Sequence, residues 1–522
     1  MVTTGEFILP HTFDVNKWDV PLRLAGPPSK EWYQVNRDGF VSGLSASESS
    51  LLFVFDNTLY ASNNNGVFRM DNAELKNWAK LTPPVPPSGP GQSPSIYIPF
   101  NNYLYVWNKN QLWWIEKGKD PNGPNWKRVK SLGLPTGQSP IPMVIFGNNI
   151  YGVHYTSSNG FEIWRTSNTG LETANWDCVV KNSFGDPQNN QSVDVMTVFN
   201  GHIYVGIGTL NKFGSFGNPS YYGTGVEIWE SSAGDLGSWS QVNVDGFGTK
   251  FSGCFGQVCN FPIHQVIGST AVYKPPGQAQ EYLYIGTLSH FGAEIWQYDG
   301  NGKNGWKNIT PPWAGPCQIG CGPGRNLSMS TFQNSLYLAE GFPTANLAKY
   351  DGNTWSVIVE GPNPFDPDNG QLPSLAVFKN RLYVSAGWPS SKPGDQVWGF
   401  PFKTPKPNIK ANGSDGLVTV SKNTNVSLTI ELNVGELAGL TADWYFVMLT
   451  AGGWYSLVWG KGWASGILPL AQFPLFNVSP PLPIFSGSFP AGNFIAFFGV
   501  DDTPDSNLSG TIWWDSVWIV SK

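Results

Sequence analysis

A short hydrophobic segment in which an aliphatic residue precedes tyrosine recurs seven times in the first four hundred residues. The pairs are Leu59-Tyr60, Leu104-Tyr105, Ile150-Tyr151, Ile203-Tyr204, Leu283-Tyr284, Leu336-Tyr337 and Leu382-Tyr383. Successive tyrosines are 45, 46, 53, 80, 53 and 46 residues apart, which suits one four-stranded blade with loops of variable length. This internal repeat predicts a β-propeller.

Other strands can be placed around each pair. An apolar strand ending in Phe and a turn precedes most pairs, as in Phe55-Asp56-Asn57, and Asn, Asp and Gly tolerate the positive φ of tight hairpins. A third strand is clearest as Glu-Ile-Trp, which begins at Glu162, Glu227 and Glu294. A fourth strand carries Trp with an apolar residue three positions later, and six copies of it serve seven units.

The missing fourth strand is found at the other end of the chain. Residues 31–35 read Glu-Trp-Tyr-Gln-Val and have the same Trp and the same apolar residue at plus three. If residues 31–36 pair with residues 395–400, both ends share one blade and no bare sheet edge is left. We therefore predict an all-β fold in which residues 1–400 form a seven-bladed β-propeller, closed by an N-terminal strand.

A second domain follows the propeller. The repeat stops after Phe400, and residues 401–409 are rich in proline, which predicts a stiff linker. Residues 410–522 contain five segments with strand-like patterns and predict a C-terminal β-sandwich; the segments are 426–432, 444–449, 454–459, 494–500 and 512–520. By analogy, such a sandwich would attach the chain to a surface or a sugar, or would bind a second ligand.

Composition fits this organisation. The 522 residues include 60 Gly, 42 Pro and 24 Trp, and only 13% are charged, as expected for many short strands and tight loops. A net charge of −6 without a concentrated basic face argues against nucleic-acid binding. No apolar run is long enough for a membrane span.

The chain start and the cysteines bear on location. Residues 1–6 lack the basic start and apolar segment of a signal peptide, so we expect a removed leader or another export route. Two close cysteine pairs predict loop disulfides and a secreted or cell-surface protein, with a four-thiolate zinc site as the alternative; the pairs are Cys254/Cys259 and Cys317/Cys321. Cys178 is expected to be a buried free thiol.

One acidic loop near the C-terminus is a candidate calcium site. Asp501, Asp502 and Asp505 bring carboxylates together within a few residues. The loop lacks the Gly and the closing Glu of a helix-loop-helix calcium site, and acidic turns between strands are usually only solvated. We expect no other cofactor.

The longest loops predict a ligand site around the propeller channel. His154, His264, His290, Asp194 and Arg325 are all expected on one face. If the protein is an enzyme, His264, His290 and Arg325 with Tyr222 would neutralise a uronate carboxylate and abstract a proton, as in a polysaccharide lyase. The alternative is that each histidine caps a loop through a hydrogen bond.

Aromatic residues outside the repeat suggest binding. Trp388, Trp313, Tyr221 and Tyr222 lie in loops rich in Gly and Pro, where exposed rings could stack on a sugar; a role in the core is equally open. The tryptophans of the repeat, such as Trp164, are expected to pack between blades. The repeated glutamates are expected to make structural hydrogen bonds to the neighbouring blade, because a glycosidase pair requires two specialised positions.

Two segments carry a family resemblance. Residues 164–170 and 229–234, each followed by Trp176 or Trp239, resemble degenerate Asp-box hairpins of sialidase-like propellers. Aspartate is absent from the defining position, and no recurring arginine set is present, so sialidase activity does not carry over. The wider pattern is similar to bacterial secreted or surface seven-bladed propellers, and this resemblance implies a fold rather than a chemistry.

Three functions remain open from the sequence. The leading one is a secreted or surface recognition protein that binds a glycan, as a lectin does, or a partner protein through the loop-rich propeller face. The second is a polysaccharide lyase or hydrolase at the channel mouth, and the third is a structural component of an extracellular assembly. The sequence favours binding over catalysis without deciding between them.

Overall fold

The protein is all-β. The computed structural model describes residues 32–40, 50–63, 66–81, 96–100, 102–108, 110–122, 124–134, 139–156, 160–167, 173–209, 223–250, 254–255, 258–260, 262–289, 292–311, 327–340, 346–359, 371–387, 395–508 and 512–522. Two compact units are distinguished and described separately. One comprises Asn36–Asp71 and Trp78–Val397; the other comprises Trp398–Lys522 with Asn72–Asn77 and residues 32–35.

The described residues contain seven four-stranded sheets. Six run in chain order: β2 (Leu51–Phe55), β3 (Thr58–Asn63), β4 (Gly66–Asn72), β5 (Asn77–Leu81); β6 (Ile96–Phe100), β7 (Tyr103–Asn108), β8 (Gln111–Glu116), β9 (Lys127–Arg128); β11 (Ile141–Phe146), β12 (Asn149–Tyr155), β13 (Phe161–Thr166), β15 (Asp177–Val180); β16 (Ser192–Phe199), β17 (His202–Gly208), β18 (Glu227–Ser231), β19 (Ser240–Gln241); β22 (Val266–Tyr273), β23 (Tyr282–Ser289), β24 (Gly292–Tyr298), β25 (Trp306–Asn308); β26 (Leu327–Phe332), β27 (Ser335–Glu340), β28 (Asn346–Tyr350), β29 (Trp355–Val359). The seventh has the order β1-β32-β31-β30, with β1 (Tyr33–Gln34), β30 (Gln371–Phe378), β31 (Arg381–Gly387) and β32 (Gln396–Phe400).

Shorter elements connect these sheets. In the described part, helical structure is limited to 3₁₀ turns, namely η1 (Asn182–Gly185), η3 (Asp245–Gly248) and η4 (Gly302–Asn304). A parallel pair joins β10 (Lys130–Leu132) to β14 (Thr173–Asn175), and β20 (Cys254–Phe255) forms a hairpin with β21 (Val258–Cys259).

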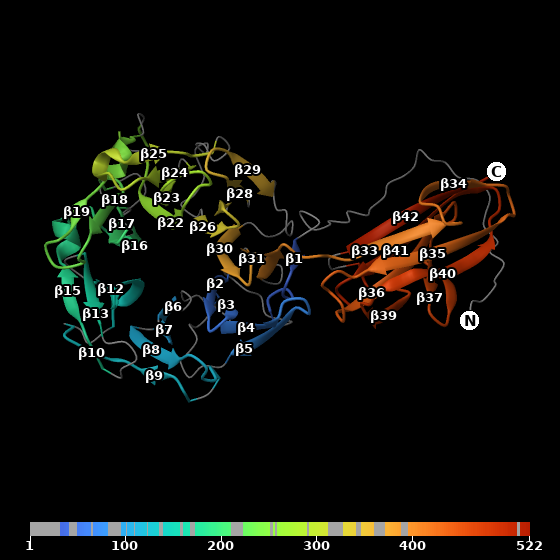
Figure 1. Ribbon diagram of the computed structural model, residues 1–522, viewed down its shortest axis with the longest axis horizontal. Helices are drawn as coiled ribbons and strands as arrows, with labels where there is room; N and C mark the ends of the chain where they lie inside the picture. Colours follow the sequence, from blue (N-terminus) through green and yellow to red (C-terminus); the bar gives the residue numbers. More distant parts are fainter. Residues whose placement is uncertain are drawn as a thin grey trace. The chain divides into compact units, whose positions relative to one another are not determined.

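The innermost strands form a closed ring (Figure 1). Each of β2, β6, β11, β16, β22, β26 and β30 contacts the next, and β30 contacts β2. Four of these contacts carry the same kind of hydrogen bond, in which a backbone amide donates to a side-chain oxygen of the preceding innermost strand. The pairs are Ile267 to Asp194 (2.9 Å), and Met329 to Ser269, Leu375 to Ser328 and Leu52 to Ser374 (3.0 Å each). This ring is a β-propeller.

The sequence pattern explains the individual sheets. All seven repeat tyrosines are buried, with at most 6% of the side chain exposed. The predicted hairpin turns are confirmed where Asp56-Asn57, Gln333-Asn334 and Lys379-Asn380 all adopt positive φ. Successive side chains of a strand point to opposite faces of the sheet. The buried repeat tyrosines therefore lie on a face that is covered by other residues.

Two asparagines, Asn243 and Asn36, bind the third strand of their sheets in the same way. Asn243 accepts a hydrogen bond from the Ile228 amide at 2.7 Å and donates to the Val226 carbonyl at 3.0 Å. Asn36 accepts from the Val397 amide at 2.7 Å and donates to the Asp395 carbonyl at 2.9 Å. The segment after β1 thus binds β32 as the segment after β19 binds β18, and β1 itself pairs with β32.

A phenylalanine in the left-handed region locks successive sheets together, a repeat that the sequence patterns above missed. Phe40, Phe184 and Phe247 have φ of 62°, 60° and 55°. Each ring stacks on a third-strand aromatic and meets a fourth-strand Trp edge-on: Phe68 and Trp78, Trp229 and Trp239, Trp296 and Trp306, respectively. In each case the short turn after an outer strand inserts a ring into the following sheet.

The second unit contains a β-sandwich. One sheet has the order β33-β35-β40, formed by β33 (Lys406–Ala411), β35 (Asn425–Asn433) and β40 (Val478–Ser488). The other has the order β34-β42-β41-β36-β37-β38, with β39 also on β36; its strands are β34 (Gly416–Val420), β36 (Thr441–Thr450), β37 (Gly453–Val458), β38 (Gly462–Ser465), β39 (Ala471–Pro474), β41 (Gly492–Asp501) and β42 (Ile512–Ser521). All five predicted strand segments overlap observed strands, and β33 begins inside the segment predicted as a linker.

The inner faces of the sandwich follow the alternation of the sequence. Val426, Leu428, Ile430 and Leu432 on β35 are all buried, and the residues between them are partly exposed. On the seven-stranded sheet, Phe446, Phe498 and Val517 lie on the inner face and are fully buried. Because successive side chains of a strand point to opposite faces, the odd-numbered residues of β36 and β41 and the even-numbered residues of β42 lie on the outer face.

The two asparagines can be compared by mutation. Replacing Asn36 or Asn243 by Ala leaves a buried backbone amide without its acceptor, so each change should lower the free energy of unfolding by about 1–3 kcal/mol. Asn353→Ala, at an exposed turn, should change it by less than about 0.5 kcal/mol. Denaturant unfolding of the three variants checks this. A neutral effect at Asn36 alone would contradict the equivalence.

Candidate functional site

An open apolar pocket lies on the outer face of the seven-stranded sheet. Its volume is about 50 Å³, far smaller than that of an enclosed small-molecule site, so it is an open groove in the surface. It is lined by Tyr445, Val447, Trp454, Ile467, Phe497, Gly499, Leu508, Ile512 and Trp514. None of these side chains carries a charge at neutral pH, and four of them are aromatic. We call this pocket the aromatic groove.

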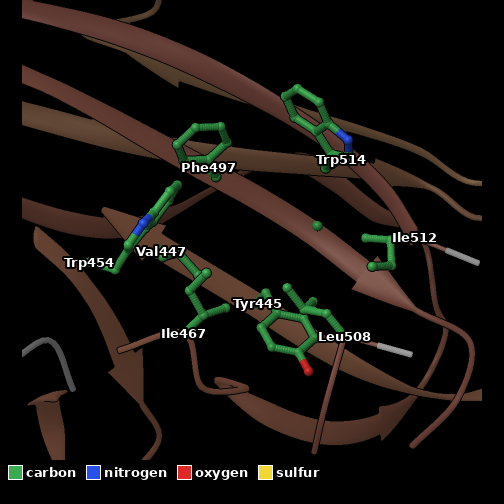
Figure 2. A pocket seen from close by; sticks show the side chains of 9 residues that line it. Tyr445, Val447, Trp454, Ile467, Phe497, Leu508, Ile512 and Trp514 are labelled. Carbon is green, nitrogen blue, oxygen red and sulfur yellow. The ribbon is translucent and has the colours of Figure 1, made fainter. Parts of the chain in front are cut away.

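Three rings form a row across the aromatic groove. Figure 2 shows Phe497 between Trp454 and Trp514. The ring centroids of Trp454 and Phe497 are 5.5 Å apart, and those of Phe497 and Trp514 are 5.7 Å apart. The rings are tilted by 44° and 54° rather than stacked, and 45% of Trp514 is exposed. Apolar ring surface is therefore available to a ligand.

The strand register brings these residues together. Tyr445 on β36 lies opposite Gly499 on β41, which lies opposite Trp514 on β42. A larger residue does not fit at Gly499, because an added Cβ would lie 3.0 Å from the Trp514 Cβ. Phe497 lies two residues before Gly499 and thus on the same face.

Three acidic side chains act on Tyr445, which lines the groove; Asp443 and Asp501 are buried, and Asp505 is exposed. Tyr445 is buried, and no described residue makes a hydrogen bond to its hydroxyl. Burial raises the pKa of this hydroxyl well above its usual value, and the negative charges of Asp443, Asp501 and Asp505 raise it further. The charged side chains that act on this lining residue are therefore all acidic.

The acidic loop proposed for calcium has other partners. The Asp502 carboxylate lies 2.7 Å from Lys76 Nζ, and both side chains are buried. Asp501 and Asp505 accept hydrogen bonds from the amides of Thr503 and Asn507. Among the described residues, no three His, Cys, Asp or Glu side chains are grouped as a metal site would require, so the geometry adds no support to calcium binding.

Asp194, a predicted ligand residue of the propeller, has structural partners. Its carboxylate accepts hydrogen bonds from the Ser192 hydroxyl at 2.6 Å and from the Ile267 amide at 2.9 Å. The second bond is of the same kind as those of Ser269, Ser328 and Ser374, although Asp194 lies one residue further from the partner of its repeat tyrosine than these serines do. The described bonds of Asp194 thus hold strands of the ring together.

His264 occupies a repeated position. It is fully buried, with Nδ1 3.0 Å from the Thr287 hydroxyl and Nε2 3.1 Å from a Glu294 carboxylate oxygen. Asn190, which like His264 lies two residues before an innermost strand, donates to Glu227 at 3.0 Å. The two residues play the same part in their sheets, and this agrees with the loop-capping alternative.

The repeated glutamates make structural hydrogen bonds, but the described donors belong to their own sheets and not to the neighbouring blade as expected. Glu162 and Glu227 accept hydrogen bonds from the indoles of Trp164 and Trp229, at 3.0 and 2.8 Å. Glu294 accepts from Asn308 at 2.8 Å. His154 is buried and lies opposite Glu162 in the strand register.

Several predicted residues lie outside the described part of the chain. These are Tyr221, Tyr222, His290, Trp313, Cys317, Cys321, Arg325 and Trp388. The backbones of Cys254 and Cys259 lie directly opposite each other in the β20–β21 hairpin, and a disulfide there stays a prediction. Cys178 is a free thiol that is partly exposed. Burial is the main cause that raises its pKa to about 11.

The aromatic groove was not predicted from the sequence. Its one visible signal is the spacing of Trp514 and Trp518, four residues apart on a strand and hence on the same face. That pattern does not reveal whether the face packs against the second sheet or meets solvent.

Comparisons with known proteins give only distant similarities. No family model and no curated protein sequence matches the chain. A sialidase from Trypanosoma rangeli is 10% identical and aligns over 91% of this chain and 88% of its own, with a TM-score of 0.30. An arabinoxylan arabinofuranohydrolase from Bacillus subtilis is 9% identical and aligns over 96% and 100%, with a TM-score of 0.31. Similarities at this level support no statement on activity.

No helix within the described ranges has the length and apolar character needed to cross a bilayer.

Glu227 should make stability depend on pH. Burial raises the pKa of its carboxyl above the usual 4.5, against the opposing effect of its hydrogen bonds with Trp229 and Asn190. A raised folded-state pKa favours the protonated form, so its contribution to stability is complete below about pH 4.5 and is lost as pH rises through the folded-state value. Glu227→Gln should remove this loss, and denaturant unfolding between pH 4 and 7 measures it. An unchanged pH profile would contradict this assignment.

The Lys76–Asp502 pair can be tested by a double-mutant cycle. Lys76→Met leaves a buried carboxylate without a cation and should lower the free energy of unfolding by about 3–5 kcal/mol. Adding Asp502→Asn to Lys76→Met should restore most of the lost free energy of unfolding. Lys80→Met, at an exposed position, is the control. Additive effects of the two substitutions would show that the pair is not coupled.

Proposed function

We propose that this is a carbohydrate-recognition protein that binds a glycan at the aromatic groove of its sandwich. The row formed by Trp454, Phe497 and Trp514 carries the proposal. Sugar rings present C–H faces that stack on aromatic side chains, and sites of this kind combine apolar walls with a few polar contacts. Secretion or display at the cell surface would suit this function.

The exposure of the rings supports binding rather than packing. A soluble protein that leaves Trp514 about half exposed beside Leu508 keeps apolar surface in water, which is unfavourable unless something covers it. Binding of a sugar ring would cover this surface without the need for a charged partner.

The alternative of a lyase or hydrolase at the propeller channel receives less support. Of its four proposed catalytic residues, His264 lies in the described part, and it is fully buried beside Thr287 and Glu294. A general base must reach the proton that it abstracts. The described geometry offers no such access for His264, and we therefore favour recognition.

The groove can be tested by removing its outer rings. Trp514→Ala and Trp454→Ala should each weaken binding by about 1–2 kcal/mol, which is about 5–30-fold in Kd. A panel of xylan, mixed-linkage β-glucan, galactomannan and polygalacturonate, measured by affinity electrophoresis and calorimetry, identifies the ligand. The same wells are assayed for released reducing or unsaturated ends.

Trp459→Ala is the matched control, because Trp459 is 74% exposed but does not line the groove. It should bind as the unmodified protein does. If the variants that lack Trp454 or Trp514 bind the glycan as well as the unmodified protein does, the groove is not the binding site. Release of reducing or unsaturated ends would favour the lyase or hydrolase alternative.

A further inference from the structure

We propose that the aromatic groove is one end of a longer platform that includes Trp518, and that the platform binds an extended, uncharged polysaccharide. This inference rests on the proposed function and specifies its ligand. It excludes isolated mono- or disaccharides and acidic chains as the preferred ligands.

The register connects Trp518 to the groove. Trp518 on β42 lies opposite Ile495 on β41, which lies opposite Leu449 on β36, and Leu449 lies opposite Trp454 on β37. Residues directly opposite each other on neighbouring strands share a face. An apolar row thus runs along the outer face from Trp454, which lines the groove, to Trp518.

The exposed rings set the length of the ligand. Trp514 and Trp518 are 45% and 47% exposed and lie four residues apart on β42. At about 3.3 Å per residue, their positions on the strand are roughly 13 Å apart. One monosaccharide ring cannot cover both, so simultaneous stacking requires several linked sugars. Leu417, opposite Trp518 on β34 and 67% exposed, extends the apolar surface further.

The charges select the chemistry of the ligand. No Lys, Arg or His lines the groove, and the neighbouring carboxylates of Asp443, Asp501 and Asp505 act on the lining residue Tyr445. A uronate or sialylated chain would approach these carboxylates without a cation among the lining residues to neutralise it. A neutral chain meets no such repulsion.

The test measures affinity against chain length. The full-length protein is titrated with neutral oligosaccharides of increasing length, cut from the polysaccharide that it binds, and with polygalacturonate. Affinity should rise with length until the chain reaches both tryptophans. Trp518→Ala should remove that rise, about tenfold for long chains, and leave short chains unaffected. Trp514→Ala should weaken both, and Trp459→Ala should weaken neither.

The possible failures are distinguishable. If Trp518→Ala binds long chains as the unmodified protein does while Trp514→Ala is weakened, the platform is wrong and the groove stands. If the protein binds polygalacturonate more tightly than the neutral chains, and Trp514→Ala weakens that binding, only the proposal that the ligand is uncharged is wrong. If substitution of Trp514 and Trp454 changes nothing, the proposed function fails and the platform fails with it. Circular dichroism of every variant confirms that it is folded.

Discussion

Most sheets of the propeller receive side chains that a neighbouring sheet supplies. A four-stranded sheet has two faces to cover, and in a ring both are covered by other sheets. In this protein the neighbour supplies two things repeatedly: a side-chain oxygen for a backbone amide of the innermost strand, as between Ser374 and Leu52, and an aromatic ring near the outer strand, as between Phe247 and Trp306. Contact between β30 and β2 closes the ring.

This dependence changes how polar residues of the propeller are interpreted. His264, Asp194 and Glu227 have the chemistry of a catalytic site, yet His264 and Glu227 occupy positions that other sheets fill with Asn or an equivalent Glu, and Asp194 accepts a backbone amide of the next innermost strand. A buried hydrogen bond between strands needs a donor and an acceptor, and several residue types satisfy that need. Chemistry at a repeated position is therefore weak evidence for catalysis.

The sandwich shows the opposite arrangement. Its outer sheet face carries large aromatic residues where a stable domain needs none, and Trp514 and Trp518 are about half exposed. The charged groups that act on Tyr445 of this face are carboxylates, of which Asp443 and Asp501 are buried and Asp505 is exposed. Large apolar side chains that are exposed together on one face are typical of a binding face.

The repeat and the hairpin turns could be predicted from the amino-acid sequence, because they follow from local periodicity and from backbone conformations that few residues tolerate. The pattern around Trp32 also indicated that these residues would complete the last sheet. The enclosure of His264 by Thr287 and Glu294, and the groove formed by Trp454, Phe497 and Trp514, became visible only in the folded structure. Such contacts join strands far apart in the chain, and strand alternation does not reveal which face meets a second sheet and which meets solvent.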